Sequence, residues 1–393
     1  MIPSFRERFN AAFKAASYAS FLSKLEAAAG APALFRLSET PCFFPVPLID
    51  SMARDGCELI RQLTTPEYQA IARQAVPPRF DVPAEPDHPL FLQVDFGLVR
   101  EPSGEIAPRL VEIQAFPSLY AYQPVLSQVY LEAYGLDPSL RYLLSGLDLP
   151  GYKELLGRAI LGGHDPENVI LLEIDPQNQK TLADFILTER MLGVRAVCIT
   201  AIRKEGRRLF YERDGRQVPI HRIYNRAIVD ELERRAIAPA FDFRDDLDVE
   251  WAGHPNDYFR ISKFSIPYLR HPSVPQTWFL DQLHHIPRDT ANYVLKPLFS
   301  FAGLGVRIGP THDEVTAIPQ EQRRDYILQE RVNFEPVIET PFGKTRAEIR
   351  IMYIWLDELL PVSLLVRMGR GAMMGVDHNK NMEWVGASAG LCQ

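Results

Sequence analysis

The stretch Asn292-Tyr-Val-Leu-Lys-Pro-Leu-Phe-Ser-Phe-Ala-Gly-Leu-Gly-Val306 carries the strongest signal in this sequence. It begins as a short β-rich run that reaches Lys296 and then continues directly into a glycine-containing loop. A lysine placed in this way can hold phosphate oxygens as a point charge, and a flexible loop can cover them. Further on, Tyr326-Ile-Leu-Gln-Glu-Arg-Val332 is an apolar strand that closes on Gln329 and Glu330, where an adenine edge could bind. Together the two stretches predict a nucleotide site.

A second lysine, Lys263, follows the apolar run Tyr258-Phe-Arg-Ile-Ser262 and is the other candidate phosphate ligand. We expect Lys263 to end a strand, as Lys296 does. The alternative for Lys263 is a solvated surface lysine. For Lys296 it is an ordinary turn, because Gly303 and Gly305 make only a short phosphate loop.

Composition sets the broad class of the protein. The chain has 393 residues, 46% of them hydrophobic, and a formal net charge of -7. This length predicts two or three domains or subdomains, and the dispersed basic residues argue against a nucleic-acid surface. The four cysteines are widely spaced, as is typical of thiols in a reducing compartment. With no membrane-spanning run and no signal peptide expected, we predict a cytoplasmic protein.

The common P-loop, dinucleotide and metalloprotease motifs are absent from the expected places in the sequence. It contains no GxxxxGK[ST] and no HExxH, and no GxGxxG follows its first clear βαβ strand. The predicted nucleotide site is therefore neither a P-loop nor a dinucleotide fold.

The order of predicted elements indicates an α/β (α+β) protein. Residues from Arg6 to Ala29 have the apolar spacing of one helix, packed on its own domain rather than on a partner. Residues 90–114 read as a β-hairpin, and residues 169–199 read as a strand, a helix and a parallel strand, hence a Rossmann-like layer. A further hairpin is expected around Asp214-Gly215, from Arg208–Tyr211 and Ile220–Tyr224.

The hairpin carries a candidate metal site made of Asp95, Glu112 and Gln114. Glu112 and Gln114 share one face of their strand because they are two residues apart. If Asp95 faces them, two carboxylates and an amide oxygen converge, which is the oxygen chemistry that Mg²⁺ prefers. The alternative is an exposed hairpin face whose acidic residues are solvated.

The last part of the chain adds two candidate arginines. Arg350 and Arg367 project from two predicted strands, and a guanidinium can bind triphosphate or acyl-phosphate oxygens bidentately. Solvated strand-edge arginines are the alternative. Asp377-His-Asn-Lys-Asn381 offers amide oxygens, and Gly386-Ala-Ser-Ala-Gly390 is expected to be a small-residue loop that can approach a ligand.

Taken in order, these segments resemble the ATP-grasp superfamily, in the circularly permuted branch typified by eukaryotic-type glutathione synthetase and glutathionylspermidine synthase. The carboxylate-bearing hairpin, Val94-Asp-Phe and Leu110-Val-Glu-Ile-Gln114, precedes the two lysines here, as it does in that branch. The resemblance covers residues 90–393. It implies three parts: a helical region with the metal hairpin (1–160), a Rossmann-like substrate subdomain (161–240), and the rest of the ATP-grasp core with the lid and adenine hinge (241–393).

The resemblance also assigns roles residue by residue. The metal ligands are Asp95, Glu112 and Gln114, and the substrate or acyl-phosphate arginines are Arg226, Arg350 and Arg367. The implied ATP-binding residues are Lys263, Lys296, Ser300, Gly303, Gly305, Gln329, Glu330 and Val332. Two positions depart from the family pattern: Gln114 replaces the usual asparagine, and Ser300 stands where glutathione synthetase has a further metal-binding glutamate.

These roles imply an ATP- and Mg²⁺-dependent carboxylate–amine ligase that works through an acyl phosphate. The expected partners are a small-molecule acid and amine, with no nucleic acid and no membrane, and a homodimer is left open. A loop around residues 301–305 is expected to close over ATP and exclude water. A non-catalytic, degenerate nucleotide-binding protein on the same scaffold is the first alternative, and a small-molecule kinase is the second.

Overall fold

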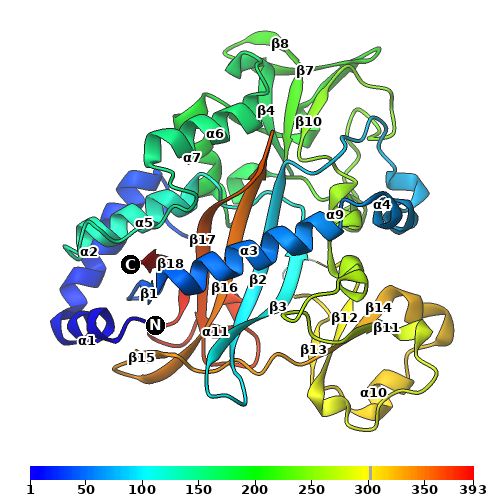
Figure 1. The fold of residues 1–393 in the computed structure, drawn as a ribbon. Coiled ribbons are helices and arrows are strands. Elements are labelled where there is room, and N and C mark those ends of the chain that lie inside the picture. The colour runs from blue at the N-terminus through cyan, green and yellow to red at the C-terminus, as the bar shows by residue number, and fades with distance from the viewer. Residues whose placement is uncertain (301–302) are drawn as a thin grey trace.

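A computed structural model describes residues 1–300 and 303–393 and places a large mixed sheet at the centre of the molecule (Figure 1). The strand order is β1-β18-β17-β16-β2-β3, with β15 beside β16. β1 pairs in parallel with β18, and the other neighbours are antiparallel. The strands are β1 (Cys42–Phe44), β2 (Phe91–Arg100), β3 (Ile106–Gln114), β15 (Ile338–Thr340), β16 (Gly343–Trp355), β17 (Leu359–Gly369) and β18 (Gly386–Cys392).

Successive side chains of β16 point to opposite faces of this sheet, and the two faces differ in polarity. Ile349 and Ile351 pack with α3 (Val46–Gln62), the helix that crosses the front face in Figure 1. Met352 points to the opposite face, where it joins the core beneath α6 (Leu149–Leu161). Glu348 and Arg350 lie on this second face, because successive strand residues point to opposite sides. The second face is thus apolar at one end and charged at the other.

The first helical segment is wrong as predicted, since residues 6–29 form two helices. These are α1 (Pro3–Ala12) and α2 (Ala15–Ala29), separated by Phe13 in an extended conformation. The break lets the Phe13 ring approach Trp384, with ring centroids 4.5 Å apart. α2 packs on α5 (Tyr122–Ala133), which in turn covers β17 and β18.

The expected βαβ unit is confirmed. β4 (Val169–Glu173), α7 (Leu182–Leu192) and β5 (Arg195–Cys198) form it, and the strands pair in parallel. The sheet order is β10-β9-β4-β5, and its outer strand β10 (Glu250–Ala252) comes from beyond residue 240. α7 ends at Gly193, whose φ of 75° suits glycine.

The hairpin at Asp214-Gly215 exists, but its second strand was misplaced. β7 (Arg208–Arg213) pairs with β8 (Arg216–Ile220) and with β6 (Arg203–Glu205). Residues 222–225 instead form β9 (Arg222–Asn225) inside the parallel sheet.

A separate sheet with the order β11-β14-β12-β13 carries the predicted lysine strand and hinge strand. β12 (Tyr293–Pro297) and β14 (Tyr326–Glu330) are confirmed as strands, and they pair antiparallel to each other. Lys263, in contrast, does not end a strand. It begins a 3₁₀ helix (Lys263–Tyr268), because the Ser262 hydroxyl accepts the Phe264 amide at 3.3 Å and starts a helical turn.

The remaining elements connect these layers. They are α4 (Pro66–Ala72), α8 (Val229–Arg234), α9 (Asp257–Arg260), α10 (His312–Thr316), α11 (Val376–Asn379), β11 (Thr277–Phe279) and β13 (Arg307–Ile308). Among the described residues, no helix has both the length and the apolar composition needed to cross a membrane.

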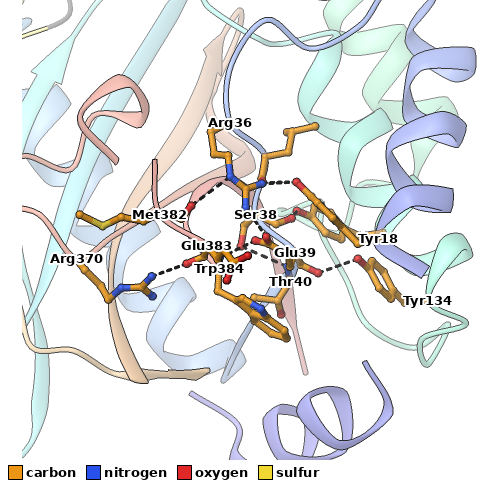
Figure 2. Close-up of polar contacts among 12 residues, drawn as sticks. Tyr18, Arg36, Ser38, Glu39, Thr40, Tyr134, Arg370, Met382, Glu383 and Trp384 are labelled. Atoms are coloured by element: carbon orange, nitrogen blue, oxygen red, sulfur yellow. Dashed lines mark hydrogen bonds and ion pairs between the residues drawn. The ribbon is translucent and has the colours of Figure 1, made fainter. Parts of the chain in front are cut away.

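The segment between β17 and β18 is tied to the N-terminal part of the chain (Figure 2). The Glu39 carboxylate accepts the Trp384 amide at 2.7 Å and also pairs with Arg36. Arg36 Nε donates to the carbonyl of Met382 at 3.4 Å. Both ends of this segment are therefore fixed, one by β17 and the other by the contacts with Arg36 and Glu39.

Candidate functional site

A cavity of about 670 Å³ lies where the charged face of the central sheet meets the β11-β14-β12-β13 sheet. Its third wall is the segment 372–378, between β17 and β18. The volume is in the usual range for a small-molecule site. Most predicted site residues line it: Glu112, Gln114, Lys263, Lys296, Ser300, Gly303, Gln329, Val332, Arg350 and Arg367.

Lys263 reaches the cavity from the start of its 3₁₀ helix. Its ammonium donates to the Ser300 carbonyl at 2.8 Å and lies 3.2 Å from Oε1 of Glu112. Burial alone would raise the pKa of Glu112, but Lys263 and other nearby cations hold that pKa below its usual value. Glu112 is therefore an ionised carboxylate with a cationic partner.

Lys296 enters from the next-to-last position of β12 and is 7% exposed. Its ammonium donates to the Val111 carbonyl at 2.9 Å. Burial lowers the pKa of Lys296 to about 8, against the opposing effect of Glu112. A buried ammonium whose one hydrogen-bond acceptor among the described residues is a carbonyl still has donors available to an anion in the cavity.

Asp95 is 2% exposed and lies beneath the cavity, with both its oxygens bound to arginines. Nε and Nη2 of Arg350 lie 2.6 Å and 2.7 Å from Oδ1 and Oδ2, and Arg367 also pairs with Oδ2. Burial would raise the pKa of Asp95, but the two guanidinium groups keep it below its usual value. Arg367 also lies 2.9 Å from Glu348.

Gln114 is likewise turned toward Arg350. Its terminal amide lies 3.1 Å from both Nη1 and Nη2. With its oxygen turned to the guanidinium the amide accepts from both, whereas in the other orientation Nε2 donates to Oε1 of Gln93 at 2.8 Å. Gln93, opposite Gln114 in the hairpin, accepts from Nη1 at 2.7 Å. The hairpin register does bring the three predicted metal ligands together, with Asp95 opposite Glu112.

The oxygens of these three residues do not fit a magnesium ion as they lie here. Those of Asp95 and Gln114 face Arg350, and Glu112 pairs with Lys263. In the described part of the chain, no cluster of three or more His, Cys, Asp or Glu side chains has a metal-binding arrangement. The assignment of Mg²⁺ ligands stays a prediction that this arrangement does not support.

The predicted hinge borders the cavity on one face of β14. Gln329 is 2% exposed, and its Nε2 has no hydrogen-bond partner among the described residues. Glu330 lies on the other face, where its carboxylate accepts a hydrogen bond from the backbone N–H of Gln276 at 3.3 Å. After the hinge, the chain runs against β2 so closely that a Cβ on Gly97 would lie 2.9 Å from Val332. Val332 is thereby fixed at the cavity wall.

The predicted lid is only partly described. Ser300 and Gly303 line the cavity, and the Ser300 hydroxyl has no hydrogen-bond partner within the described ranges. Gly305, with φ of 75°, lies beside Pro297 and is not part of the lining. Phe301 and Ala302, which belong to the predicted lid, are outside the described residues.

Arg226 lies apart from this cavity. It is 4% exposed, and its guanidinium stacks on Phe116 at 5.0 Å and on Phe185 at 5.7 Å. Nε and Nη1 have no hydrogen-bond partner in the part of the chain that the structure covers. Phe116 also lines the cavity, so a single ring separates the predicted substrate arginine from it.

Several cavity residues were not predicted. Arg346 lines the cavity and donates to the Gly371 carbonyl at 3.1 Å. Lys180 also lines it and pairs with Asp377 at 2.6 Å. Side chains two residues apart on a strand point to the same face, so the position of Arg346 two residues before Glu348 on β16 could have identified it. The predicted small-residue loop 386–390 is wrong: it is part of β18, and the segment 372–378 approaches the cavity instead.

The comparisons with known proteins bear on the fold. No protein-family model matches the chain, and no curated protein matches it in sequence. A solved structure of a glutathione synthetase-like effector (GSS30) from Globodera pallida, in its apo form, aligns with a TM-score of 0.61. The alignment covers 96% of this chain and 95% of the other, at 11% identity. The two chains share a fold. At this identity, the likeness to the effector extends no further than the fold.

Proposed function

We propose that this protein is an ATP-dependent carboxylate–amine ligase of the circularly permuted ATP-grasp type. The observation that carries the proposal is the meeting of Lys263 and Lys296 in one cavity with the hinge residue Gln329. The two lysines come from a 3₁₀ helix and a strand in separate segments of the sequence. Their convergence is therefore a property of the fold. The likeness to a glutathione synthetase-like protein supports the same class.

The charges of the cavity suit a triphosphate. Lys263, Lys296, Arg350 and Arg367 supply positive charge, and only part of it is neutralised by Glu112, Glu348 and Asp95. The unpaired amide of Gln329 and hydroxyl of Ser300 supply hydrogen-bonding groups along the same wall. Buried polar groups without partners are costly, so a polar ligand would stabilise this wall.

In the proposed reaction, a substrate carboxylate attacks the γ-phosphate of ATP, ADP leaves, and an acyl phosphate forms. An amine then attacks the acyl carbon, phosphate leaves, and an amide bond results. Lys263 and Lys296 would offset charge on the transferred phosphoryl group, and Arg367 would orient the acyl phosphate. The wall at 372–378 would exclude water, which otherwise hydrolyses the intermediate.

A degenerate nucleotide-binding protein is the second candidate. The observation in its favour is Arg350, whose contacts with Asp95 and Gln114 occupy the oxygens that a catalytic metal would need. The Globodera pallida protein of similar fold is a glutathione synthetase-like effector. A kinase on the same scaffold is a third reading without a specific observation in its favour.

Trapping with hydroxylamine separates these candidates. Hydroxylamine converts an acyl phosphate into a stable hydroxamate, so a ligase gives hydroxamate and ADP when supplied with its acid and ATP. A kinase gives a stable phosphorylated product instead, and a degenerate binder gives neither. Lys296→Met should abolish hydroxamate formation, whereas Lys344→Met, at a lysine 62% exposed on β16, should not change it.

A further inference from the structure

We propose that the guanidinium of Arg350 takes the place of a divalent cation in this cavity. The protein would then bind nucleotide phosphates without a metal ion held by Asp95, Glu112 and Gln114. The inference rests on the proposed nucleotide site, but one part of its test does not depend on a nucleotide.

The guanidinium of Arg350 is surrounded by the oxygens that a metal would use. Asp95 accepts from Nε at 2.6 Å and from Nη2 at 2.7 Å, and Gln93 accepts from Nη1 at 2.7 Å. The Gln114 amide lies 3.1 Å from both Nη atoms. One cation thus collects the carboxylate and amide groups of two neighbouring strands, as a bound metal does.

The backbone fixes this cation in place. Arg350 of β16 is directly opposite Asp95 of β2 in the sheet register, and the Arg350 side chain is only 11% exposed. An arginine keeps its charge at every pH at which proteins fold. A metal ion at this point would meet that fixed positive charge and would lose ligands already bound to the guanidinium.

The other carboxylates near the cavity do not supply metal ligands in place of the oxygens bound to Arg350. Glu112 pairs with Lys263, and Glu348 pairs with Arg367. Mg²⁺ binds through about six oxygen ligands in strict octahedral geometry, so it needs free carboxylate oxygens at this site.

Arg367 keeps a donor available for phosphate, and both arginines contribute positive charge. Arg350 and Arg367 both line the cavity, and Nε of Arg367 has no hydrogen-bond partner among the described residues. A guanidinium can bind phosphate oxygens bidentately, so it supplies both charge and orientation. The pair can therefore serve the charge-neutralising part of a metal's role toward a bound nucleotide.

The first test uses the wild-type protein. ATP binding is measured by calorimetry in EDTA and again in Mg²⁺, and Mn²⁺ binding without nucleotide is followed by electron paramagnetic resonance. We expect the ATP dissociation constant to change by less than about tenfold between the two buffers. We also expect Mn²⁺ to stay free. Loss of ATP binding in EDTA, or stoichiometric Mn²⁺ binding by the wild type, would overturn the inference.

The second test removes the guanidinium. Arg350→Gln releases the oxygens of Asp95 and Gln114 while Asp95 keeps Arg367 as a partner. We expect this variant to gain Mn²⁺ binding and to bind ATP more tightly with Mg²⁺ than in EDTA. The matched control is Arg346→Gln, another cavity arginine on the same strand, which should gain neither property. Equal behaviour of the two variants would contradict the inference.

The outcomes separate this inference from the proposed function. Absence of binding by any nucleotide in either buffer overturns the nucleotide site, and with it the stated role of Arg350. Binding of ATP only in Mg²⁺ keeps the nucleotide site and overturns the role of Arg350. If Arg350→Gln does not fold, as judged by circular dichroism, the wild-type measurements decide alone.

Discussion

The guanidinium of Arg350 contacts both carboxylate oxygens of Asp95, although the two residues are 255 positions apart in the chain. The pair joins β16 to β2 under the cavity, and Arg367 adds a second cation to the same carboxylate. Removing one member of a buried ion pair leaves an uncompensated charge and commonly costs about 3–5 kcal/mol. We predict a loss of this size in the free energy of unfolding for Asp95→Ala, measured by urea denaturation.

The control for Asp95→Ala is Glu339→Ala. Glu339 also pairs across strands, at 3.3 Å from Lys344, but its side chain is 67% exposed. Exposed pairs contribute about 1 kcal/mol or less. Equal destabilisation by the two substitutions would show that the Asp95 network does not stabilise the fold.

The pH dependence of stability should report the buried carboxyl group of Asp257. Burial raises its pKa from the usual value of 3.8 to about 8 in the folded protein. Because the unfolded chain loses this proton at lower pH than the folded chain does, the contribution of Asp257 to stability falls as pH rises from about 4 to about 8. Asp257→Asn cannot lose a proton and should escape this fall.

The measurement compares urea unfolding of wild type and Asp257→Asn at pH 5 and pH 8. The stability of the variant relative to wild type should increase between these values, by about 1.4 kcal/mol for each pH unit. Asp357→Asn is the control, since its carboxylate is 86% exposed and should leave the pH profile unchanged. A constant difference between wild type and Asp257→Asn would contradict the prediction.

Nucleotide affinity should also depend on pH, through Lys296. Burial lowers the pKa of this ammonium to about 8, so the free protein loses the charge as pH rises through that value. We expect ATP affinity to weaken between pH 7 and pH 9, approaching about tenfold per pH unit above the pKa. Lys296→Arg keeps its charge over this range, so calorimetric titrations of that variant should give a much flatter profile. An equally steep fall in both proteins would exclude Lys296 as its source.

The wall at residues 372–378 depends on one buried amide. Asn379 accepts the amides of Arg370 and Gly371 at 3.1 Å and 3.0 Å, and its Nδ2 donates to the Met373 carbonyl at 2.8 Å. Each unsatisfied buried group costs about 1–3 kcal/mol. Asn379→Ala should therefore speed hydrogen exchange in residues 370–375 and weaken ATP binding several-fold. Asn381→Ala, at an exposed position, should change neither.

The sequence predicted local features of the site well. The strands holding Lys296 and Gln329 have short apolar runs, and the 91–114 hairpin is bounded by clear turn residues, so nearby residues determine them. Lys263 was misjudged because a serine turn, rather than the apolar run before it, decides the local structure. The small residues at 386–390 suggested a loop, but they belong to a strand. Gly390 is small because a Cβ there would lie 2.2 Å from Leu364.

Long-range pairing could not be predicted in the same way. Nothing near Asp95 in the sequence indicates that Arg350 will lie opposite it, since that contact depends on the register of β2 with β16. The same applies to Arg226, whose position under Phe116 results from the packing of the parallel sheet. Local sequence therefore predicts some of the candidate ligand-binding residues, whereas the charged groups that pair with them depend on the whole fold.

The proposed function requires that the cavity bind ATP. The most direct measurement is calorimetric titration of ATP, with Mg²⁺ present, into the wild type, Lys296→Met and Lys344→Met. We predict saturable binding of one ATP per chain to the wild type and to Lys344→Met, and loss of binding in folded Lys296→Met. Unchanged binding by Lys296→Met, or no binding of ATP to the wild type, would contradict it.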